Sequence, residues 1–133
     1  MSTEAIIQQL RACFSEVQPS VLAAYLYGSH ARGEARPGSD VDVALLLKPE
    51  HAAATLVGPI RRIQGELERR LRCEVDVLDL RSAPVDLVHR VLRDGVLLVE
   101  NDANARIAFE VDARNRYFDL LPYLQEYRRR PVA

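Results

Sequence analysis

Two short motifs carry side chains that together could perform chemistry on a phosphorylated substrate. The first is Gly28-Ser29, which follows an apolar run, and the second is Asp40-Val41-Asp42, which begins another apolar run. Glycine lets the backbone approach a phosphate closely, and a serine hydroxyl can bind a phosphate oxygen. Two carboxylates two residues apart on a strand lie on one face, where they can bind a hard divalent cation such as Mg²⁺. The motifs therefore indicate metal-dependent chemistry on a nucleoside triphosphate.

A third acidic residue is expected from a later strand, because metal-dependent nucleotidyl transfer needs a carboxylate that positions the cation near the attacking group. The run 74–80 alternates in character, and Asp76 lies in its middle between two valines. A carboxylate is costly to bury there without a cation or hydrogen bonds, so we assign Asp76 to the site and expect Asp79 to cap the following turn. Arg32 adds positive charge near the Gly-Ser turn, and Ser39 joins it as a candidate for binding the nucleotide.

Each of these residues also has a structural explanation when it is considered alone. A Gly-Ser pair commonly forms a turn, acidic residues at a strand start commonly cap a turn, and Arg32 can be a solvated surface residue. His30 can contact a substrate or pack in the interior. The whole combination rarely arises from packing alone, which favours a functional site.

The elements that must position these residues follow from the apolar pattern. Helices are predicted over 3–17, 51–72, 84–93 and 103–128, and strands over 21–27, 41–47, 74–80 and 96–100. A helical turn is expected over 30–34, and Pro19 is expected to end the first helix. Gly58-Pro59 is expected to split or kink the second long helix, and Pro122 to kink the last one. The order predicts an α/β domain whose sheet carries the motifs between its first two strands.

The composition favours a globular protein of one domain and argues against several other classes of protein. The 133 residues are 48% hydrophobic and 28% charged, which is ordinary for a globular chain of one domain over 1–133. A net charge of −1 without an aromatic-rich basic stripe argues against RNA or DNA as a partner. Neither a membrane span nor a signal peptide is apparent. The two cysteines lack the spacing of a zinc site or a disulfide scaffold, so we expect a cytoplasmic protein.

The combined pattern resembles the minimal nucleotidyltransferases, which belong to the superfamily of DNA polymerase β and kanamycin nucleotidyltransferase. The residues that match its signature one by one are Gly28, Ser29, Asp40, Asp42 and Asp76. The resemblance covers most of the chain. It implies a polymerase β-like α/β (α+β) fold with a small mixed sheet flanked by helices. It also implies a single minimal domain, with a core over about 3–100, a C-terminal helix over about 103–128 and no added substrate domain.

The resemblance also implies an activity and a partner. Proteins of this MNT type are antitoxins that transfer AMP from ATP to a tyrosine of a HEPN-type ribonuclease toxin and so silence it. By this resemblance Asp40 and Asp42 bind two Mg²⁺ ions, and Asp76 completes the site near the attacking hydroxyl. Gly28 and Ser29 hold the β- and γ-phosphates. The hydroxyl attacks the α-phosphorus in line, pyrophosphate leaves, and Asp76 is the best candidate to accept the proton, with water as the alternative.

Two other functions remain open. A small-molecule nucleotidyltransferase of the aminoglycoside type usually has an added domain that forms half of the acceptor pocket, whereas this chain offers only its last helix. An antitoxin that acts by binding alone needs a surface that contacts the toxin. Residues 103–127 can supply this surface, or they can pack on the chain's own sheet. The apolar residues near one face of that segment are Ile107, Val111, Phe118, Leu121 and Leu124, and further interface candidates are Tyr117, Tyr123, Tyr127 and the arginines at 128–130. A hetero-oligomer with the toxin is expected.

Overall fold

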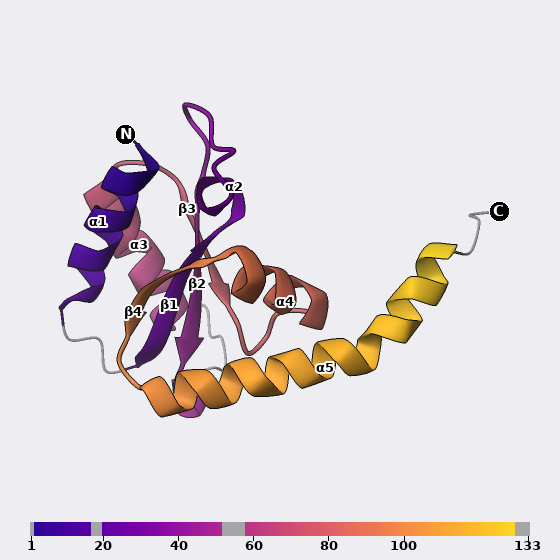
Figure 1. Cartoon of the computed structure of the whole chain (residues 1–133). Coiled ribbons are helices and arrows are strands. Elements are labelled where there is room, and N and C mark those ends of the chain that lie inside the picture. The colour runs from indigo at the N-terminus through magenta and orange to yellow at the C-terminus, as the bar shows by residue number, and fades with distance from the viewer. Residues whose placement is uncertain (1, 17–19, 52–57, 130–133) are drawn as a thin grey trace.

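The computed structural model describes residues 2–16, 20–51 and 58–129, and its described part contains a four-stranded sheet between two layers of helices (Figure 1). The strands are β1 (Val21–Tyr27), β2 (Val41–Leu47), β3 (Val75–Asp79) and β4 (Val96–Glu100). Their order across the sheet is β3-β2-β1-β4. β1 is antiparallel to β2 and to β4, while β2 and β3 are parallel. The predicted mixed sheet flanked by helices is confirmed.

The helical elements cover both faces of this sheet. They are α1 (Thr3–Phe14), α2 (Gly28–Ala31), the 3-10 turn η1 (Pro49–His51), α3 (Pro59–Leu71), α4 (Val85–Asp94) and α5 (Ala103–Arg129). α1 and α3 pack on one face, and α4 with the first half of α5 packs on the other. Three strands, β1, β2 and β4, have the predicted bounds, whereas β3, α4 and α5 each differ from the prediction by one residue at one or both ends.

The bounds of two helices correct the predictions. α1 ends at Phe14 instead of near residue 17, because Ser15 caps it and donates its N–H to the carbonyl of Arg11; Pro19 lies outside the described residues. The helix α3, which was predicted over 51–72, has Pro59 as its first residue. The N–H groups at the start of a helix have no partner within it, so a proline, which has no N–H, is well suited to this position. Gly58 is thus the N-cap and Pro59 the first residue of this helix. Residues 52–57 lie outside the described residues, so the predicted split or kink at Gly58-Pro59 stays a prediction.

The two faces of the sheet have separate sets of core side chains. Residues of β2 alternate between these faces: Val43 and Leu45 pack with α1 and α3, while Ala44 and Leu46 pack with α4 and α5. Asp42 follows the same alternation, so its side chain lies on the α4/α5 face. The packing of β2 thus decides the face on which the acidic motif acts.

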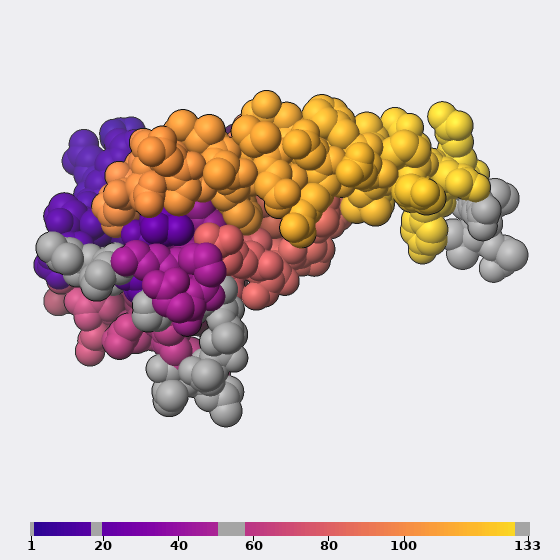
Figure 2. Space-filling model, turned by 90° about the horizontal axis from the view of Figure 1, so that it is seen from below, coloured from indigo at the N-terminus to yellow at the C-terminus, as the bar shows by residue number. Residues whose placement is uncertain are grey.

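α5 is attached to the sheet through its first half. The Tyr25 hydroxyl donates to Glu110 Oε1 at 2.8 Å, and Arg106 forms ion pairs with Glu100 and Glu110. The helix has 27 residues and continues through Pro122. Its distal end extends beyond the rest of the molecule (Figures 1 and 2). Neither α5 nor any other helix of the described residues has the length and apolar character needed to cross a membrane.

Candidate active site

Asp42 and Asp76 lie opposite each other on the parallel strands β2 and β3. The register pairs Asp42 with Asp76, and on the other side it pairs Asp42 with Tyr27 of β1. Paired residues project from the same face of a sheet, so all three polar side chains share the α4/α5 face. Asp42 is half-buried and Asp76 is exposed. The structure therefore brings two of the three predicted acids together at a position that solvent can reach.

The carboxylates act on one another electrostatically. Desolvation raises the pKa of the Asp42 carboxyl, and the negative charges of Asp76 and Asp40 raise it further, against an opposing effect of His30 and Arg32. Burial, together with the negative charges of Asp42 and Asp76, raises the pKa of Tyr27 to about 12. Within the described residues none of the three acids forms an ion pair. The negative charge of the acids is thus opposed only by the more distant effects of His30 and Arg32 and not by an ion pair within the described residues.

This donor set suits a hard divalent cation. Mg²⁺ prefers carboxylate oxygens and keeps several waters and substrate phosphates among its ligands, and a cation between the acids would relieve their mutual repulsion. No cluster of three or more acidic, histidine or cysteine side chains in metal-binding geometry occurs among the described residues. Asp40, Asp42 and Asp76 are thus not a preassembled ligand set, and their role as metal ligands stays a prediction.

The Gly-Ser turn lies directly against Asp42. Gly28 has a φ of 74°, and a Cβ added at this position would collide with the Asp42 carboxylate. α2 covers Gly28–Ala31 instead of the predicted 30–34, because positive φ lets the chain turn at Gly28 and the Arg32 N–H then bonds the Gly28 carbonyl at 3.2 Å. Ser29 is partly exposed beside the acids, where its hydroxyl can meet a phosphate.

Arg32 and Ser39 have local partners in the structure. Arg32 Nε donates to Glu34 Oε2 at 3.1 Å, and such exposed pairs are weak, so the guanidinium can turn to an anion at little cost. The Ser39 hydroxyl accepts the N–H of Arg36 at 2.8 Å, which closes the turn before Asp40. Ser39 thus has a structural role, and nucleotide binding by either residue stays a prediction.

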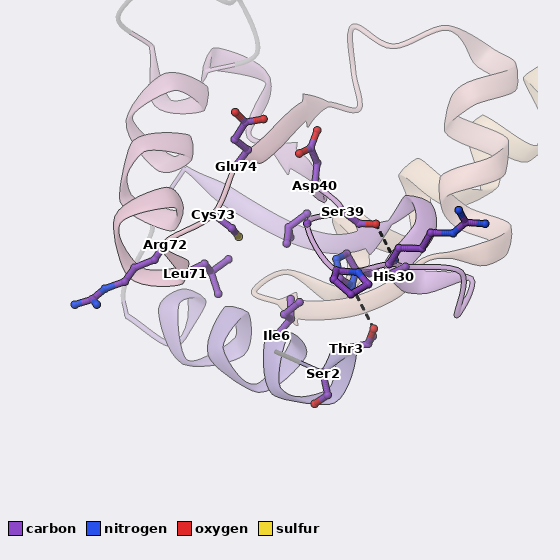
Figure 3. A pocket seen from close by; sticks show the side chains of 15 residues that line it. Ser2, Thr3, Ile6, His30, Ser39, Asp40, Leu71, Arg72, Cys73 and Glu74 are labelled. Atoms are coloured by element: carbon purple, nitrogen blue, oxygen red, sulfur yellow. Dashed lines mark hydrogen bonds between the residues drawn. The ribbon is translucent and has the colours of Figure 1, made fainter.

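A pocket of about 800 Å³ lies next to Asp40 (Figure 3). Its walls come from the start of α1, the loop 35–40 and the turn between α3 and β3, and its lining includes Ser39 and Asp40 but neither Asp42 nor Asp76. Asp40 and Glu74 lie on its edge, with carboxylates that point away from Ile6 (Figure 3). The structure therefore places Ser39 at this pocket and the paired acids on the α4/α5 face.

A family model described as polymerase beta, nucleotidyltransferase matches residues 8–104. The chain belongs to this nucleotidyltransferase family. The matched residues include Gly28, Asp42 and Asp76, so the turn and the acid pair lie inside the domain that defines the family.

Known relatives agree with this membership. The nucleotidyltransferase is similar to the protein adenylyltransferase MntA of Shewanella oneidensis, with 36% identity over 78 residues that cover 58% of this chain and 52% of that protein. The chain thus matches about half the length of this curated relative. It is also similar to a chain in a crystal structure of a toxin–antitoxin with AMP-PNP, with 28% identity, a TM-score of 0.68 and coverage of 96% and 95% of the two chains. A further likeness is to a chain of the toxin–antitoxin MntA–HepT, with 27% identity, a TM-score of 0.61 and coverage of 94% and 92%.

His30 links the Gly-Ser turn of this nucleotidyltransferase to α1. Its ring is buried, with 6% of the residue exposed, and Nδ1 lies 3.2 Å from Thr3 Oγ1. Nε2 is buried and has no hydrogen-bond partner among the described residues. Of the two roles that the sequence left open for His30, the burial favours packing, because the ring holds α2 against the start of α1.

The His30–Thr3 link gives a prediction about stability. Thr3→Val leaves both nitrogens of the buried imidazole without a hydrogen-bond partner. It is expected to lower the free energy of unfolding by about 1–2 kcal/mol, because an unpaired buried polar group retains its desolvation penalty. The double variant Thr3→Val/His30→Phe removes both partners and keeps a flat ring, so it is expected to cost less than Thr3→Val alone. Urea denaturation of both variants measures the difference. A larger loss for the double variant than for Thr3→Val alone would mean that Nε2 has a partner of its own.

Asp79 has the role that the sequence assigned to it. Its Oδ1 accepts the N–H of Arg81 at 3.0 Å, and its Oδ2 accepts the hydroxyl of Ser82 at 3.1 Å. The side chain is buried on the turn that follows β3. This satisfied carboxylate differs from the unpaired Asp76 three residues earlier, which supports the choice of Asp76 as the acid of the site.

Sequence analysis assigned no role to Tyr27. The structure places it beside Asp42 and on the same face as Asp76. An aromatic residue just before Gly28 was visible in the sequence, but its proximity to the acids depends on the β1–β2 register. The charges of Asp42 and Asp76 contribute to the raised pKa of Tyr27, which shows that its hydroxyl is electrostatically coupled to both acids.

Proposed function

We propose that this nucleotidyltransferase is a protein adenylyltransferase antitoxin, which transfers AMP from ATP to a tyrosine hydroxyl of a HEPN-type toxin and so inactivates it. The observation that carries the proposal is the unpaired Asp42–Asp76 couple held against the Gly28 turn. Similarity to a protein adenylyltransferase and to toxin–antitoxin chains, one with AMP-PNP, supports the substrate and the partner. We further propose that residues 1–133 act as one minimal domain, and that the reaction takes place in the cytoplasm, where ATP is available.

The residues of the turn are proposed to bind the triphosphate. The absence of a side chain at Gly28 allows phosphate oxygens to approach the backbone, and the Ser29 hydroxyl donates to one of them. Arg32 exchanges its exposed pairing with Glu34 for a phosphate, which a guanidinium binds well. Ser39 is proposed to contact the nucleotide as well, from its place beside Asp40.

The acids are proposed to bind Mg²⁺: Asp40 and Asp42 would hold two ions, and Asp76 would complete the site. When bound, the ions supply neutralisation of the triphosphate charge and polarisation of the reacting phosphoryl group. Asp76 is the more exposed acid of the Asp42–Asp76 pair, so an acceptor hydroxyl that comes from solvent reaches Asp76 first. Its carboxylate orients this hydroxyl and accepts its proton, directly or through a water.

The proposed reaction is an in-line displacement. The tyrosine oxygen of the acceptor forms a bond to the α-phosphorus of ATP, and the bond between the α-phosphorus and the oxygen that bridges to the β-phosphate breaks. Pyrophosphate leaves with that oxygen, and the acceptor carries AMP. The protein's part is positioning and charge stabilisation, as in other phosphoryl and nucleotidyl transfers.

The assignment of Asp76 is tested by a pair of matched variants. Asp76→Asn is expected to lower the rate of AMP transfer to the co-expressed HEPN-type protein by about 100-fold or more, because one carboxylate of the site loses its charge. Glu74→Gln is the control, since Glu74 is an exposed acid two residues away. Transfer is measured by intact mass of the partner and by labelled ATP.

The outcomes separate the candidate functions. Equal loss in both variants would show that general negative charge matters and that Asp76 has no special role. A partner that never gains the mass of AMP, yet is neutralised, would indicate an antitoxin that acts by binding alone. Labelling of an aminoglycoside in place of the partner would indicate the small-molecule enzyme.

A further inference from the structure

α5 exposes large apolar side chains both on the part that is attached to the sheet and on its distal end. The most exposed large apolar residues of the described chain all lie on this helix, and they are Ile107, Val111, Phe118, Tyr123 and Tyr127. Single exposed apolar residues are common on protein surfaces and need no special explanation. Tyr123 and Tyr127 differ, because they lie on the part of α5 that extends past the body (Figures 1 and 2).

The two tyrosines continue the face of α5 that packs on the sheet. Phe109 and Ala113 belong to the core on the α4/α5 face, and Leu120 lies two turns after Ala113. Residues three and four apart lie on one side of a helix, so Tyr123 and Tyr127 extend this same side. They are 71% and 80% exposed. The core-facing side of α5 therefore continues beyond the core that it serves.

The distal segment, which we define as residues 120–129, lies beyond the residues whose hydrogen bond and ion pairs attach α5 to the sheet. The hydrogen bond and ion pairs that attach α5 to the sheet involve residues 106 and 110. Pro122 lacks the N–H that would bond one turn back, which weakens the helix. The segment continues a helix of 27 residues, so it needs no nucleation of its own, but its free end is expected to fray and to be stabilised further by a binding partner.

The exposed arginines of the distal segment and a hollow beside α5 indicate what kind of partner binds there. Arg128 and Arg129 are exposed and form no ion pair within the described residues. A hollow of about 290 Å³ between α4 and α5 is lined by Arg114 and Phe118, among others. α4 in turn contacts α2, which carries Ser29. A partner seated on the distal segment thus lies on the side of the sheet that carries the acid pair.

We propose that residues 120–129 dock the protein that this nucleotidyltransferase modifies, through an apolar groove on that protein with acidic residues at its rim. Tyr123 and Tyr127 occupy the groove, and Arg128 and Arg129 pair with the acidic rim. The inference rests on the proposed function, because it assigns the acceptor protein to this surface. The toxin–antitoxin chain with AMP-PNP aligns with 96% of this chain, so its fold includes most or all of α5.

A second copy of the chain fits this surface less well. A stable interface of standard size uses about 20–30 residues a side. Two distal segments paired with each other offer about ten residues each. An acceptor protein that lies in the angle between the distal segment and α4 can contact both elements, which gives it a larger interface than the distal segment alone offers.

The test compares the double variant Tyr123→Ala/Tyr127→Ala with Arg61→Ala/Arg62→Ala, which removes two exposed side chains of α3 on the opposite face. The probe is a HEPN-type protein of the kind that the proposed function names as acceptor, in a form without ribonuclease activity. The tyrosine variant is expected to bind it at least about tenfold more weakly, whereas the arginine variant binds normally. Both are expected to keep the wild-type melting temperature, because neither pair is buried.

Hydrogen exchange supplies a second measurement. Amides of residues 120–129 are expected to exchange rapidly in the free protein and to gain protection in the complex. Unchanged binding in the tyrosine variant, or no gain of protection, overturns the inference. Protection that rises with the chain's own concentration, together with dimers in sedimentation, also overturns it in favour of a second copy. A partner that binds through this segment but gains no AMP overturns the proposed function and the identification of that partner as the acceptor, and it leaves the segment as a docking surface.

Discussion

Replacing Asp42 with asparagine is expected to abolish AMP transfer and at the same time to raise the melting temperature of the metal-free protein. Asp42 is the central acid, since it is paired with Asp76 across the strands and contacts the Gly28 turn. Loss of its charge removes a proposed metal ligand, and we expect the rate to fall by about 100-fold or more. The same change removes a half-buried charge that has no ion-pair partner in the described residues, so the folded state gains stability.

The pH dependence of stability tests the same residue without activity. Desolvation and the charges of Asp76 and Asp40 raise the pKa of Asp42 in the folded state, so the folded protein holds this proton more tightly than the unfolded chain. Stability of the metal-free protein therefore falls as pH rises from the ordinary carboxyl range through the raised pKa of Asp42. Asp42→Asn lacks this loss, and its advantage over the wild type is expected to be absent in acid and full at neutral pH.

Thermal melts across pH, with and without Mg²⁺, measure both effects. Mg²⁺ is expected to stabilise the wild type, because a ligand that binds only the folded state adds to its stability, and to leave Asp42→Asn unchanged. Asp79→Asn is the contrasting variant: Asp79 is buried and accepts two hydrogen bonds, so its change should destabilise the protein. A wild-type rate of transfer in Asp42→Asn would remove Asp42 from the proposed mechanism.

The sequence was sufficient to predict the strands and the residues that they carry. The apolar runs around β1 and β2 are bounded by Gly28 and by the acidic motif, so local pattern alone gave their bounds. Alternation along β3 separated Asp76 from Asp79. These features depend on neighbours in the chain, which a sequence displays directly.

Features that depend on pairing between distant segments were not predictable in the same way. The proximity of Tyr27 to Asp42 requires the β1–β2 register, and the contact of His30 with Thr3 requires the packing of α2 on α1. The start of α3 at Pro59 was missed because an apolar stripe continued through the preceding residues, while proline at the first helical position decided the boundary. Sequence periodicity does not carry this information.

Gly28→Ala is expected to lower both stability and activity, and the two losses have separate physical causes. The first is backbone strain, because Gly28 has a φ of 74°, a region that costs a residue with a Cβ about 1–2 kcal/mol. The second is the collision of the new methyl group with the Asp42 carboxylate, which must rotate away from Asp76. We expect AMP transfer to fall by about 100-fold or more, because displacement of a catalytic group by about 1 Å can have that effect.

Gly33→Ala separates the two causes. Gly33 has a φ of 71°, close to that of Gly28, but nothing lies within 4 Å of an added Cβ. This variant is expected to lose about 1–2 kcal/mol from backbone strain and to transfer AMP at nearly the wild-type rate. Urea denaturation and labelled transfer of both variants give the comparison. Equal activity of the two variants would show that the space beside Asp42 is not needed for the reaction.

A double-mutant cycle then isolates the contact itself. Asp42→Ala removes the carboxylate that the methyl group of Gly28→Ala would meet, so Gly28→Ala should cost less stability in the Asp42→Ala background than in the wild type. A coupling of about 0.5 kcal/mol or more is expected for groups in direct contact. Additive changes in the free energy of unfolding would mean that Gly28→Ala destabilises the protein through backbone strain alone. A measured coupling would mean that a side chain at residue 28 is excluded because Asp42 occupies the space in which the phosphate-binding turn and the acids meet.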